Sequence, residues 1–163
     1  MTLLHTPYYF FYQSPVGWIK LGASDTGLML AYFMKAREED DRPNAVTREA
    51  LRQLEAYFEG RLKSFDLPLE MQGTDFQRSV WTELLKIPFG KTISYLALSQ
   101  RLGDEKAIRA AARANGQNPL PVIVPCHRVI GSDGSLTGYS GGLWRKKWLL
   151  QHEGLLPQLE LPL

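Results

Sequence analysis

The single cysteine of this 163-residue chain lies in the segment Pro125-Cys126-His127-Arg128-Val129. A proline before the thiol and an imidazole after it are suited to hold the side chain rigidly and to remove its proton, and the thiolate is the nucleophilic form. The alternative is that Cys126 is an inert, small buried hydrophobe, the usual situation of a free cysteine. The adjacent His127 and Arg128, with a carboxylate later in the chain, favour the reactive interpretation.

Composition restricts the class of protein. One cysteine excludes an intramolecular disulfide, and a hydrophobic content of 44% is enough to bury a core in one domain or two small ones. The opening Met1-Thr2-Leu3-Leu4-His5 lacks the pattern of a leader, and no apolar run approaches a membrane span. We therefore expect a cytoplasmic protein without membrane contact. One cysteine and three histidines give no metal-ligand spacing, so neither a metal nor a cofactor is predicted.

The first half of the chain predicts an antiparallel sheet followed by a helix. Aromatic and branched runs cover residues 8–12, 17–21 and 28–33, with turn signals between them. After an acidic loop that covers residues 38–44, a helix is expected to begin at Thr47 and to end at Gly60. Its apolar residues share one face, and they are Leu51, Leu54, Tyr57 and Phe58. This half carries no phosphate-binding loop, carboxylate pair or metal-ligand spacing, and it is predicted to be structural.

A domain boundary is predicted near Gly73. The pattern Thr74-Asp75-Phe76-Gln77 is typical of a capping box at a helix start. The expected domains are 1–72 and 73–163. The first carries 8 Lys and Arg against 10 Asp and Glu, a net charge of −2, and the second carries 11 against 7, a net charge of +4. The basic second domain suggests a polyanionic partner, although such a charge is also common on solvated surfaces.

Two short helices with a tight break are predicted in the second domain. The first covers residues 94–102 and the second covers residues 105–115, with Gly103 between them, in the outline of a helix-turn-helix. The second helix is rich in alanine around Arg109 and Arg113, which share a face. Small side chains would let this helix approach DNA closely. The alternative is an alanine-rich helix packed against its neighbour, with two solvated arginines.

Three sequence blocks then occur in a specific order. They are NPLPVIVPCHRVIG at residues 118–131, TGYSGG at 137–142 and WLLQHEG at 148–154. From about Gly73 to Gly154 the chain closely resembles the 6-O-alkylguanine-DNA alkyltransferases, also called methylated-DNA–protein-cysteine methyltransferases. The first domain resembles them mainly in size and strand content. The resemblance implies an α/β (α+β) fold, with a ribonuclease-H-like antiparallel sheet and helix followed by a mainly helical domain that carries the helix-turn-helix.

The same resemblance implies DNA repair by direct damage reversal. Cys126 would take the alkyl group from 6-O-alkylguanine, and less readily from 4-O-alkylthymine, in one irreversible turnover of a suicide enzyme. The implied partner is double-stranded DNA, contacted in its minor groove, with the damaged base flipped out. A base inside a duplex hides its alkyl carbon from a thiol, so flipping is physically required. A monomer is expected, and cooperative assembly along DNA is left open.

The resemblance also assigns the catalytic residues. His127 is the proton acceptor for Cys126, Glu153 orients and stabilises the imidazole, and Asn118 ties the turn before the active segment to the helix pair. One geometric difficulty follows from the sequence. Adjacent residues on an extended strand point to opposite faces, so the chain must bend after Pro125 or a water must bridge the thiol and the imidazole. The alternative for Glu153 is a surface carboxylate at a helix end.

Contacts to the base are implied for a second group of residues. The Tyr95 hydroxyl donates to a ring nitrogen, the Ser140 amide donates to the 6-oxygen, and Tyr139 forms a wall of the pocket. The backbone carbonyls of Cys126 and Val129 accept from the exocyclic amine.

Contacts to the DNA backbone and groove complete the implied site. Arg109 occupies the gap left by the extruded nucleotide, and Tyr95 helps to rotate the backbone. Ser94 and Arg113 are the other expected DNA contacts. Arg128 is interpreted as a structural ion-pair partner or a phosphate contact, with no catalytic role.

Three other functions fit parts of the pattern. A non-catalytic binder of alkylated DNA would share the architecture, but the presence of Cys126 argues against it. A cysteine hydrolase could use Cys126, His127 and Glu153, and it would need an oxyanion hole. A helix-turn-helix regulator with a structural cysteine would have no use for the loop that carries Tyr139 and Ser140.

Overall fold

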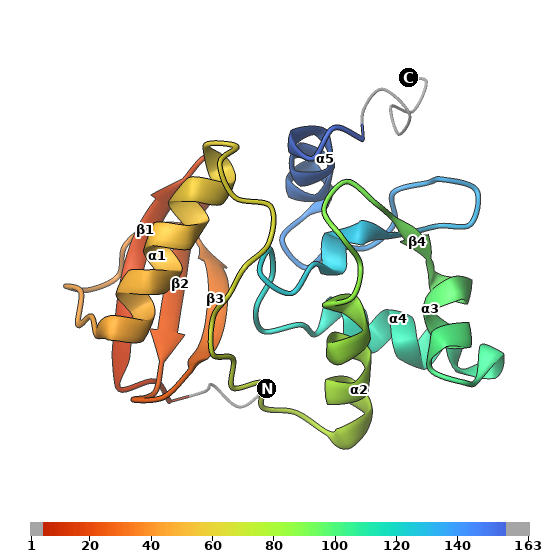
Figure 1. Cartoon of the computed structure of the whole chain (residues 1–163), viewed down its shortest axis with the longest axis horizontal. Helices are drawn as coiled ribbons and strands as arrows, with labels where there is room; N and C mark the ends of the chain where they lie inside the picture. Colours follow the sequence, from red (N-terminus) through yellow and green to blue (C-terminus); the bar gives the residue numbers. More distant parts are fainter. Residues whose placement is uncertain (1–4, 156–163) are drawn as a thin grey trace. The chain divides into compact units, whose positions relative to one another are not determined.

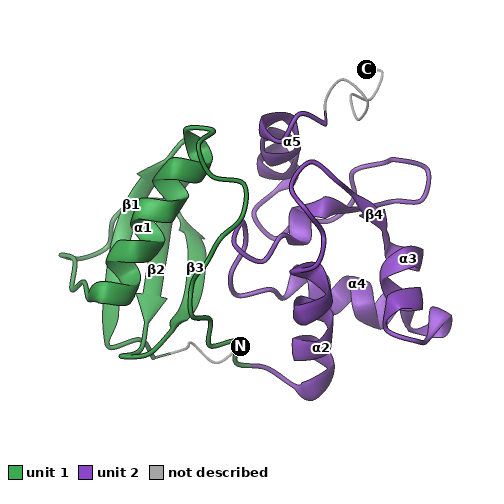
Figure 2. Cartoon of the chain, in the orientation of Figure 1, with its two compact units in different colours: residues 1–72 green, residues 73–163 purple. Residues whose placement is uncertain are grey.

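The computed structural model describes residues 5–155. The chain divides into two compact units, residues 1–72 and residues 73–163 (Figure 2). The prediction that the chain does not open on a leader rests on residues that include 1–4, which lie outside the described residues. No helix in the described range is long and apolar enough to cross a membrane.

The first unit is a three-stranded antiparallel sheet with one helix (Figure 1). Strands β1 (Tyr8–Ser14), β2 (Gly17–Ala23) and β3 (Leu28–Met34) pair in sequence order, and α1 (Ala45–Phe58) packs against them. Burial of branched and aromatic side chains between helix and sheet holds the unit together. The residues buried most completely include Phe11, Ile19, Leu21, Leu28, Leu54 and Tyr57. The three strand predictions are confirmed.

The helix α1 begins two residues before the predicted Thr47. Asn44 is the N-cap, and its side chain accepts a hydrogen bond of 2.9 Å from the Thr47 amide. The Thr47 hydroxyl accepts in return from the Asn44 amide at 2.9 Å. Thr47 is therefore the third residue of a capping box and not the start of the helix. Gly60 follows the C-cap in a left-handed conformation with φ of 79°.

The second unit is mainly helical and opens on α2 (Asp75–Leu84). Thr74 caps this helix, with reciprocal bonds between its backbone and side chain and those of Gln77. The predicted capping box is therefore confirmed. Trp81 is buried, and its indole donates to the backbone carbonyl of Ala114 at 2.8 Å.

The helix-turn-helix consists of α3 (Tyr95–Arg101), a single 3₁₀ turn η1 (Glu105–Ala107), and α4 (Ile108–Gly116). The prediction of one continuous α-helix from residue 105 was wrong at its first turn. The Asp104 side chain accepts from the Lys106 amide at 2.9 Å, and the Ala107 amide donates to the Asp104 carbonyl at 3.1 Å. These bonds tighten the turn to a 3₁₀ spacing.

A short parallel pairing joins two segments that the sequence did not link. Strand β4 (Ile93–Ser94) pairs with β5 (Val129–Ile130), which directly follows the 3₁₀ turn η2 (Cys126–Arg128). The helix α5 (Leu143–His152) then closes the described chain. Because β4 leads directly into α3, the pairing holds the start of the helix-turn-helix beside the cysteine segment.

Candidate active site

The loop before the cysteine is held by Asn118, which is buried. Its carbonyl oxygen accepts from the Leu120 amide at 2.9 Å, and its amide nitrogen donates to the Val124 carbonyl at 2.7 Å. Val122 lies between these two residues in a left-handed conformation with φ of 75°. A β-branched residue adopts this conformation at a cost of about 1–3 kcal/mol, so the surrounding bonds must hold it in place.

The chain bends at the cysteine, as the first of the two sequence alternatives required. Cys126, His127 and Arg128 form one turn of 3₁₀ helix, in which the Arg128 amide donates to the Pro125 carbonyl at 3.0 Å. All three side chains are buried. Successive residues in such a turn do not alternate between opposite faces, so the thiol and the imidazole are not forced apart.

Glu153 lies at the centre of a buried ionic network. The His127 Nε2 lies 2.7 Å from Oε2 of Glu153. Arg128 donates from Nε to Oε1 at 2.8 Å and from the guanidinium to Oε2 at 3.0 Å, while the Gly90 amide donates to Oε1 at 3.2 Å. The Glu153 side chain has no exposed area. The alternative of a surface carboxylate was wrong, and Arg128 is a buried ion-pair partner.

This network determines which atoms of the histidine carry protons. Burial alone would raise the pKa of Glu153, but hydrogen bonds from His127 and Arg128 outweigh it and hold that pKa below its ordinary value. Burial lowers the pKa of His127, and Glu153 opposes this only in part. The imidazole is therefore neutral at pH 7, with Nε2–H donating to the carboxylate. Its Nδ1 is buried and bonds to none of the described residues, so Nδ1 is the free base.

The thiol itself is not ionised at rest. Burial raises the pKa of Cys126 to about 11, although hydrogen bonds from Asn118 and Tyr139 and the charge of Lys146 oppose the shift. The predicted role of His127 as proton acceptor is therefore needed for the thiol to react. The proton must leave during the reaction, which makes a nearby base necessary.

Lys146 is a site residue that the sequence analysis missed. It has no exposed area, and its ammonium donates to the carbonyls of Val129 at 2.7 Å, Thr137 at 3.0 Å and Gly138 at 3.3 Å. Burial lowers its pKa to about 8, and Cys126 opposes this. Through these hydrogen bonds the Lys146 ammonium joins β5 to the loop that precedes α5. The available signal was its position in α5, three residues before the buried Leu149, which places both side chains on the same buried face of the helix. A lysine on such a face needs hydrogen-bond partners for its charge.

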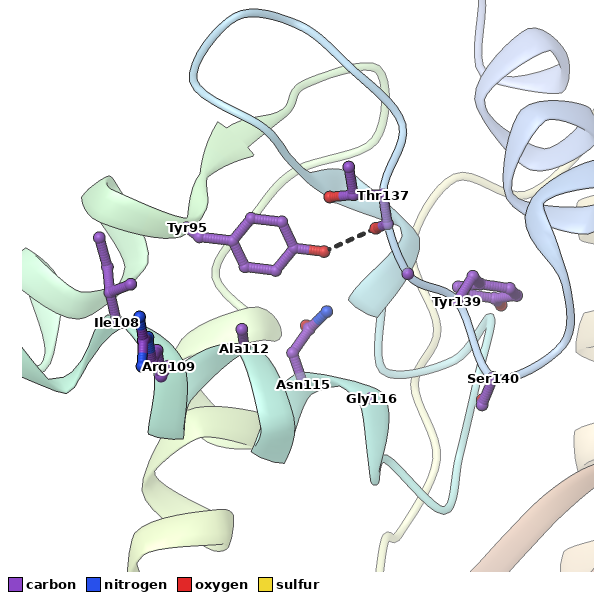
Figure 3. Close-up of a pocket in the computed structure, with 10 residues that line it drawn as sticks. Tyr95, Ile108, Arg109, Ala112, Asn115, Gly116, Thr137, Tyr139 and Ser140 are labelled. Carbon is purple, nitrogen blue, oxygen red and sulfur yellow. Dashed lines mark hydrogen bonds between the residues drawn. The ribbon is translucent and has the colours of Figure 1, made fainter.

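A pocket of about 480 Å³ lies between the helix-turn-helix and the loop before α5 (Figure 3). Its lining residues are Tyr95, Ile108, Arg109, Ala112, Asn115, Gly116, Thr137, Gly138, Tyr139 and Ser140. The four residues predicted to hold or replace the base, namely Tyr95, Arg109, Tyr139 and Ser140, are therefore brought together. In this structure the Tyr95 hydroxyl donates to the Thr137 carbonyl at 2.9 Å.

The remaining predicted residues take different positions. Arg113 is exposed on α4 and does not line the pocket. The Ser94 side chain caps α3 by accepting from the Ala97 amide at 3.0 Å. The Val129 carbonyl accepts from Lys146. Within residues 5–155 no group of three or more His, Cys, Asp or Glu side chains is placed to hold a metal ion.

Two family models match the chain in succession. The ribonuclease-like domain of 6-O-methylguanine DNA methyltransferase matches residues 7–71, and the DNA binding domain of the same family matches residues 75–155. The methylated-DNA–protein-cysteine methyltransferase of Methanosarcina acetivorans is 48% identical over 153 residues, which cover 90% of this chain and 98% of that protein. The chain belongs to this methyltransferase family. The family predicted from the sequence blocks is confirmed.

Solved structures agree with the family assignment. The crystal structure of Mycobacterium tuberculosis O6-methylguanine methyltransferase matches with a TM-score of 0.81 at 42% identity, covering 90% of this chain and 92% of that chain. The structure of Mycobacterium tuberculosis OGT in complex with DNA also matches at 0.81, with 43% identity, 89% of this chain and 91% of that chain covered. The predicted α+β class, with a ribonuclease-like first domain, is confirmed.

Proposed function

We propose that this methyltransferase repairs DNA by transferring the alkyl group of 6-O-alkylguanine to Cys126. One observation carries the proposal. The only thiol of the chain adjoins a buried imidazole whose Nε2 is held by Glu153 at 2.7 Å, and Asn115 and Tyr139, which line the pocket, hydrogen-bond to Cys126. A nucleophile, a base and an orienting carboxylate are thus assembled behind residues that line the pocket.

The proton of the thiol goes to Nδ1 of His127. A water that bridges the sulfur and Nδ1 suits this buried, unpaired base and leaves Nε2–H on Glu153. The resulting imidazolium is stabilised by the carboxylate, as in other relays of nucleophile, base and acid. Ionisation of the thiol then takes place only when the lesion is bound beside it.

The thiolate attacks the alkyl carbon in line with the carbon–oxygen bond. The new carbon–sulfur bond forms as the carbon–oxygen bond breaks, and the electron pair stays on the guanine. The Tyr95 hydroxyl and the Ser140 amide donate to the leaving base, and the Cys126 and Val129 carbonyls accept from its exocyclic amine. The imidazolium proton is returned to the base, so charge is balanced. The product is a thioether, and the single turnover follows because neither water nor a thiol readily cleaves its carbon–sulfur bond.

Binding of the lesion must exchange one hydrogen bond. The Tyr95 hydroxyl is engaged with the Thr137 carbonyl, to which Lys146 also donates. When Tyr95 turns to the base, Lys146 retains the carbonyl and keeps the loop in place. Tyr95 thereby changes its partner without leaving a buried acceptor unpaired.

The helix-turn-helix supplies the contact with double-stranded DNA. Arg109 is exposed at the pocket, where it can fill the gap left by a flipped nucleotide, and α4 enters the minor groove. Arg113 and Ser94 are proposed to contact the backbone. We assign the structural role to residues 1–72 and the DNA-binding and alkyl-accepting role to residues 73–163. The protein acts as a monomer in the cytoplasm, where reducing conditions preserve the thiol.

Intact-mass spectrometry with a duplex that carries one 6-O-methylguanine tests the proposal. The wild type is expected to gain one methyl group on Cys126, with guanine restored in the DNA, and Cys126→Ser is expected to gain none. Unchanged mass with preferential binding of the lesion duplex indicates a non-catalytic lesion binder and overturns alkyl transfer. Neither modification nor lesion binding would direct attention to hydrolase substrates. Duplexes that carry 4-O-methylthymine, tested in the same way, are expected to react more slowly.

A further inference from the structure

Arg145 is a cation in the first turn of α5 to which the transfer reaction assigns no role. Its side chain is half-buried, and its guanidinium donates to the backbone carbonyl of Gly141 at 2.7 Å. The guanidinium also lies against the indole of Trp144, with 4.5 Å between Cζ and the ring centroid. A cation is attracted to the face of an aromatic ring. Arg145 is therefore held in one orientation against the loop that precedes α5.

The Gly141 carbonyl belongs to a tight turn that borders the pocket. The turn covers residues 139–142 and is closed by a hydrogen bond of 2.8 Å from the Gly142 amide to the Tyr139 carbonyl. Ser140, at the second position of this turn, lines the pocket next to Tyr139 (Figure 3). No described residue accepts a hydrogen bond from the Ser140 amide. This N–H is therefore available for the proposed contact with the guanine 6-oxygen.

These two hydrogen bonds connect Arg145 to the Ser140 amide through two peptide groups. Each peptide group joins the carbonyl of one residue to the N–H of the next. The Gly141 carbonyl, which accepts from Arg145, thus shares its peptide group with the Gly142 N–H. That N–H donates to the Tyr139 carbonyl, which shares its own peptide group with the Ser140 N–H. A continuous chain of hydrogen bonds and peptide groups therefore runs from the guanidinium to the N–H proposed to bind the base.

All the groups in this chain point in the same direction. Each peptide group accepts on the side of Arg145 and donates on the side of the pocket, so the cation makes the Ser140 N–H a stronger donor. Hydrogen bonds in such chains strengthen one another by about 10–30% per bond, and a charged donor forms a bond roughly twice as strong as a neutral one. Negative charge develops on the guanine 6-oxygen as its bond to the alkyl carbon breaks. A stronger donor there lowers the barrier more than it strengthens binding of the lesion.

We propose that Arg145 is a positioning residue that fixes the turn of residues 139–142 and polarises the Ser140 amide toward the leaving guanine 6-oxygen. This inference rests on the proposed transfer to Cys126. Arg145 does not touch the base, and it neither gains nor loses a proton. It acts on the direction and the strength of the hydrogen bond donated to the oxygen that keeps the electron pair.

Single-turnover methyl transfer from a duplex with 6-O-methylguanine tests this role in three variants. Arg145→Lys keeps the charge, Arg145→Gln keeps only a neutral donor, and Arg145→Met keeps neither. Arg145→Met is expected to lower the rate at saturating protein about tenfold, less than the roughly 10²–10³-fold effect of losing an oxyanion donor itself. Arg145→Gln should be nearly as slow, and Arg145→Lys should stay within about threefold of the wild type. The protein concentration at half-saturation should change little, because the charge on the oxygen develops only during the reaction.

A double-mutant cycle tests whether Arg145 acts through the Ser140 amide. Ser140→Pro removes this N–H at a turn position that favours proline. In that background Arg145→Met should slow transfer by less than about twofold, because the chain then ends before the base. Lys147→Met is the matched control, since it removes a half-buried cation of the same helix outside the pocket lining, and its saturated rate should equal that of the wild type. Urea denaturation confirms that each variant is folded.

The outcomes separate this inference from the proposed function. Failure of the wild type to take a methyl group from 6-O-methylguanine overturns alkyl transfer itself. Equal rates in the wild type and Arg145→Met overturn only the role of Arg145, and so does an equal slowing by Arg145→Met with and without the Ser140 amide. If Ser140→Pro does not fold, equal rates in Arg145→Lys and Arg145→Gln overturn polarisation by the charge. A loss of lesion affinity as large as the loss of rate likewise overturns it, since Arg145 would then only support the fold.

Discussion

The two sides of the active site differ in how their polar groups are satisfied. Behind the cysteine, His127, Arg128 and Glu153 are buried, and Glu153 accepts hydrogen bonds from both of the others. On the pocket side, Tyr95 is bonded to a backbone carbonyl that Lys146 also serves, and Asn115 leaves an acceptor unpaired. The first arrangement is suited to fix a base in one protonation state, and the second is suited to exchange partners when a lesion enters.

The largest effect is expected from removal of the base on the buried side. His127→Gln should slow methyl transfer by about 10²–10⁴-fold, the usual contribution of a positioned general base. Affinity for the lesion duplex should be nearly unchanged, because His127 is fully buried and does not line the pocket. Single-turnover kinetics and a binding titration measure the two quantities. A variant that loses lesion affinity as strongly as rate would show that the two sides are not separable.

Removal of the central carboxylate should affect stability as well as rate. Glu153→Gln leaves the Arg128 cation buried without its counter-ion, and we expect a loss of about 3–5 kcal/mol in the free energy of unfolding. The matched control is Glu59→Gln, which breaks the exposed pair with Arg61 and should change stability by about 1 kcal/mol or less. Urea denaturation measures both. Similar losses in the two variants would contradict the special role of the buried network.

Acidification should lower the free energy of unfolding through the buried His127 and Glu153 before it affects the pocket. The folded pKa of His127 lies below 6.5, so the unfolded chain binds more protons as pH falls through that value, and stability decreases. The folded pKa of Glu153 lies below 4.5, so its contribution is present above pH 4.5 and is lost at lower pH. Denaturation midpoints between pH 8 and pH 4 test the sign. The decrease should be reduced in His127→Gln.

The rate of transfer should follow the same base. It should rise as His127 loses its proton below pH 6.5 and then stay level up to about pH 8, where Lys146 begins to lose the proton with which it holds the loop. The Cys126 thiol ionises only at about pH 11. Rates from pH 5 to 9 on the methylated duplex measure this profile. A rate that climbs tenfold per pH unit across neutrality would instead indicate attack by a thiolate that forms independently of His127.

The smallest effects should distinguish the two arginines of α4, Arg109 and Arg113. Arg109→Ala should reduce binding to the lesion duplex more than binding to undamaged DNA, because Arg109 lines the pocket. Arg113→Ala should weaken both by a similar few-fold factor and lower the salt dependence by about one counter-ion. Titrations at several salt concentrations measure these changes. Equal selectivity losses in the two variants would place Arg109 among the general phosphate contacts.

Local signals were sufficient for much of the fold. The three strands, the capping box at Thr74 and the break at Gly103 depend on side chains and neighbours within a few residues, and the structure has all of them. The start of α1 was misplaced because Asn44 was assigned to a loop although it caps the helix. The turn at Glu105 was assigned to an α-helix because capping chemistry alone does not distinguish a 3₁₀ start.

The sequence by itself determined the family, and it predicted the nucleophile and the residues that could surround the lesion, because these follow from residue types in ordered blocks. Only the tertiary structure decided their protonation, their burial and their hydrogen-bond partners. Burial keeps the Cys126 thiol protonated and places Glu153 in the interior, while the pairing of β4 with β5 holds Tyr95 near the cysteine segment. It also brought Asn115 into the pocket lining and Lys146 onto the carbonyls of Thr137 and Gly138, which line it. The physical reason is that pKa values and unpaired hydrogen-bonding groups depend on desolvation and on partners distant in the chain.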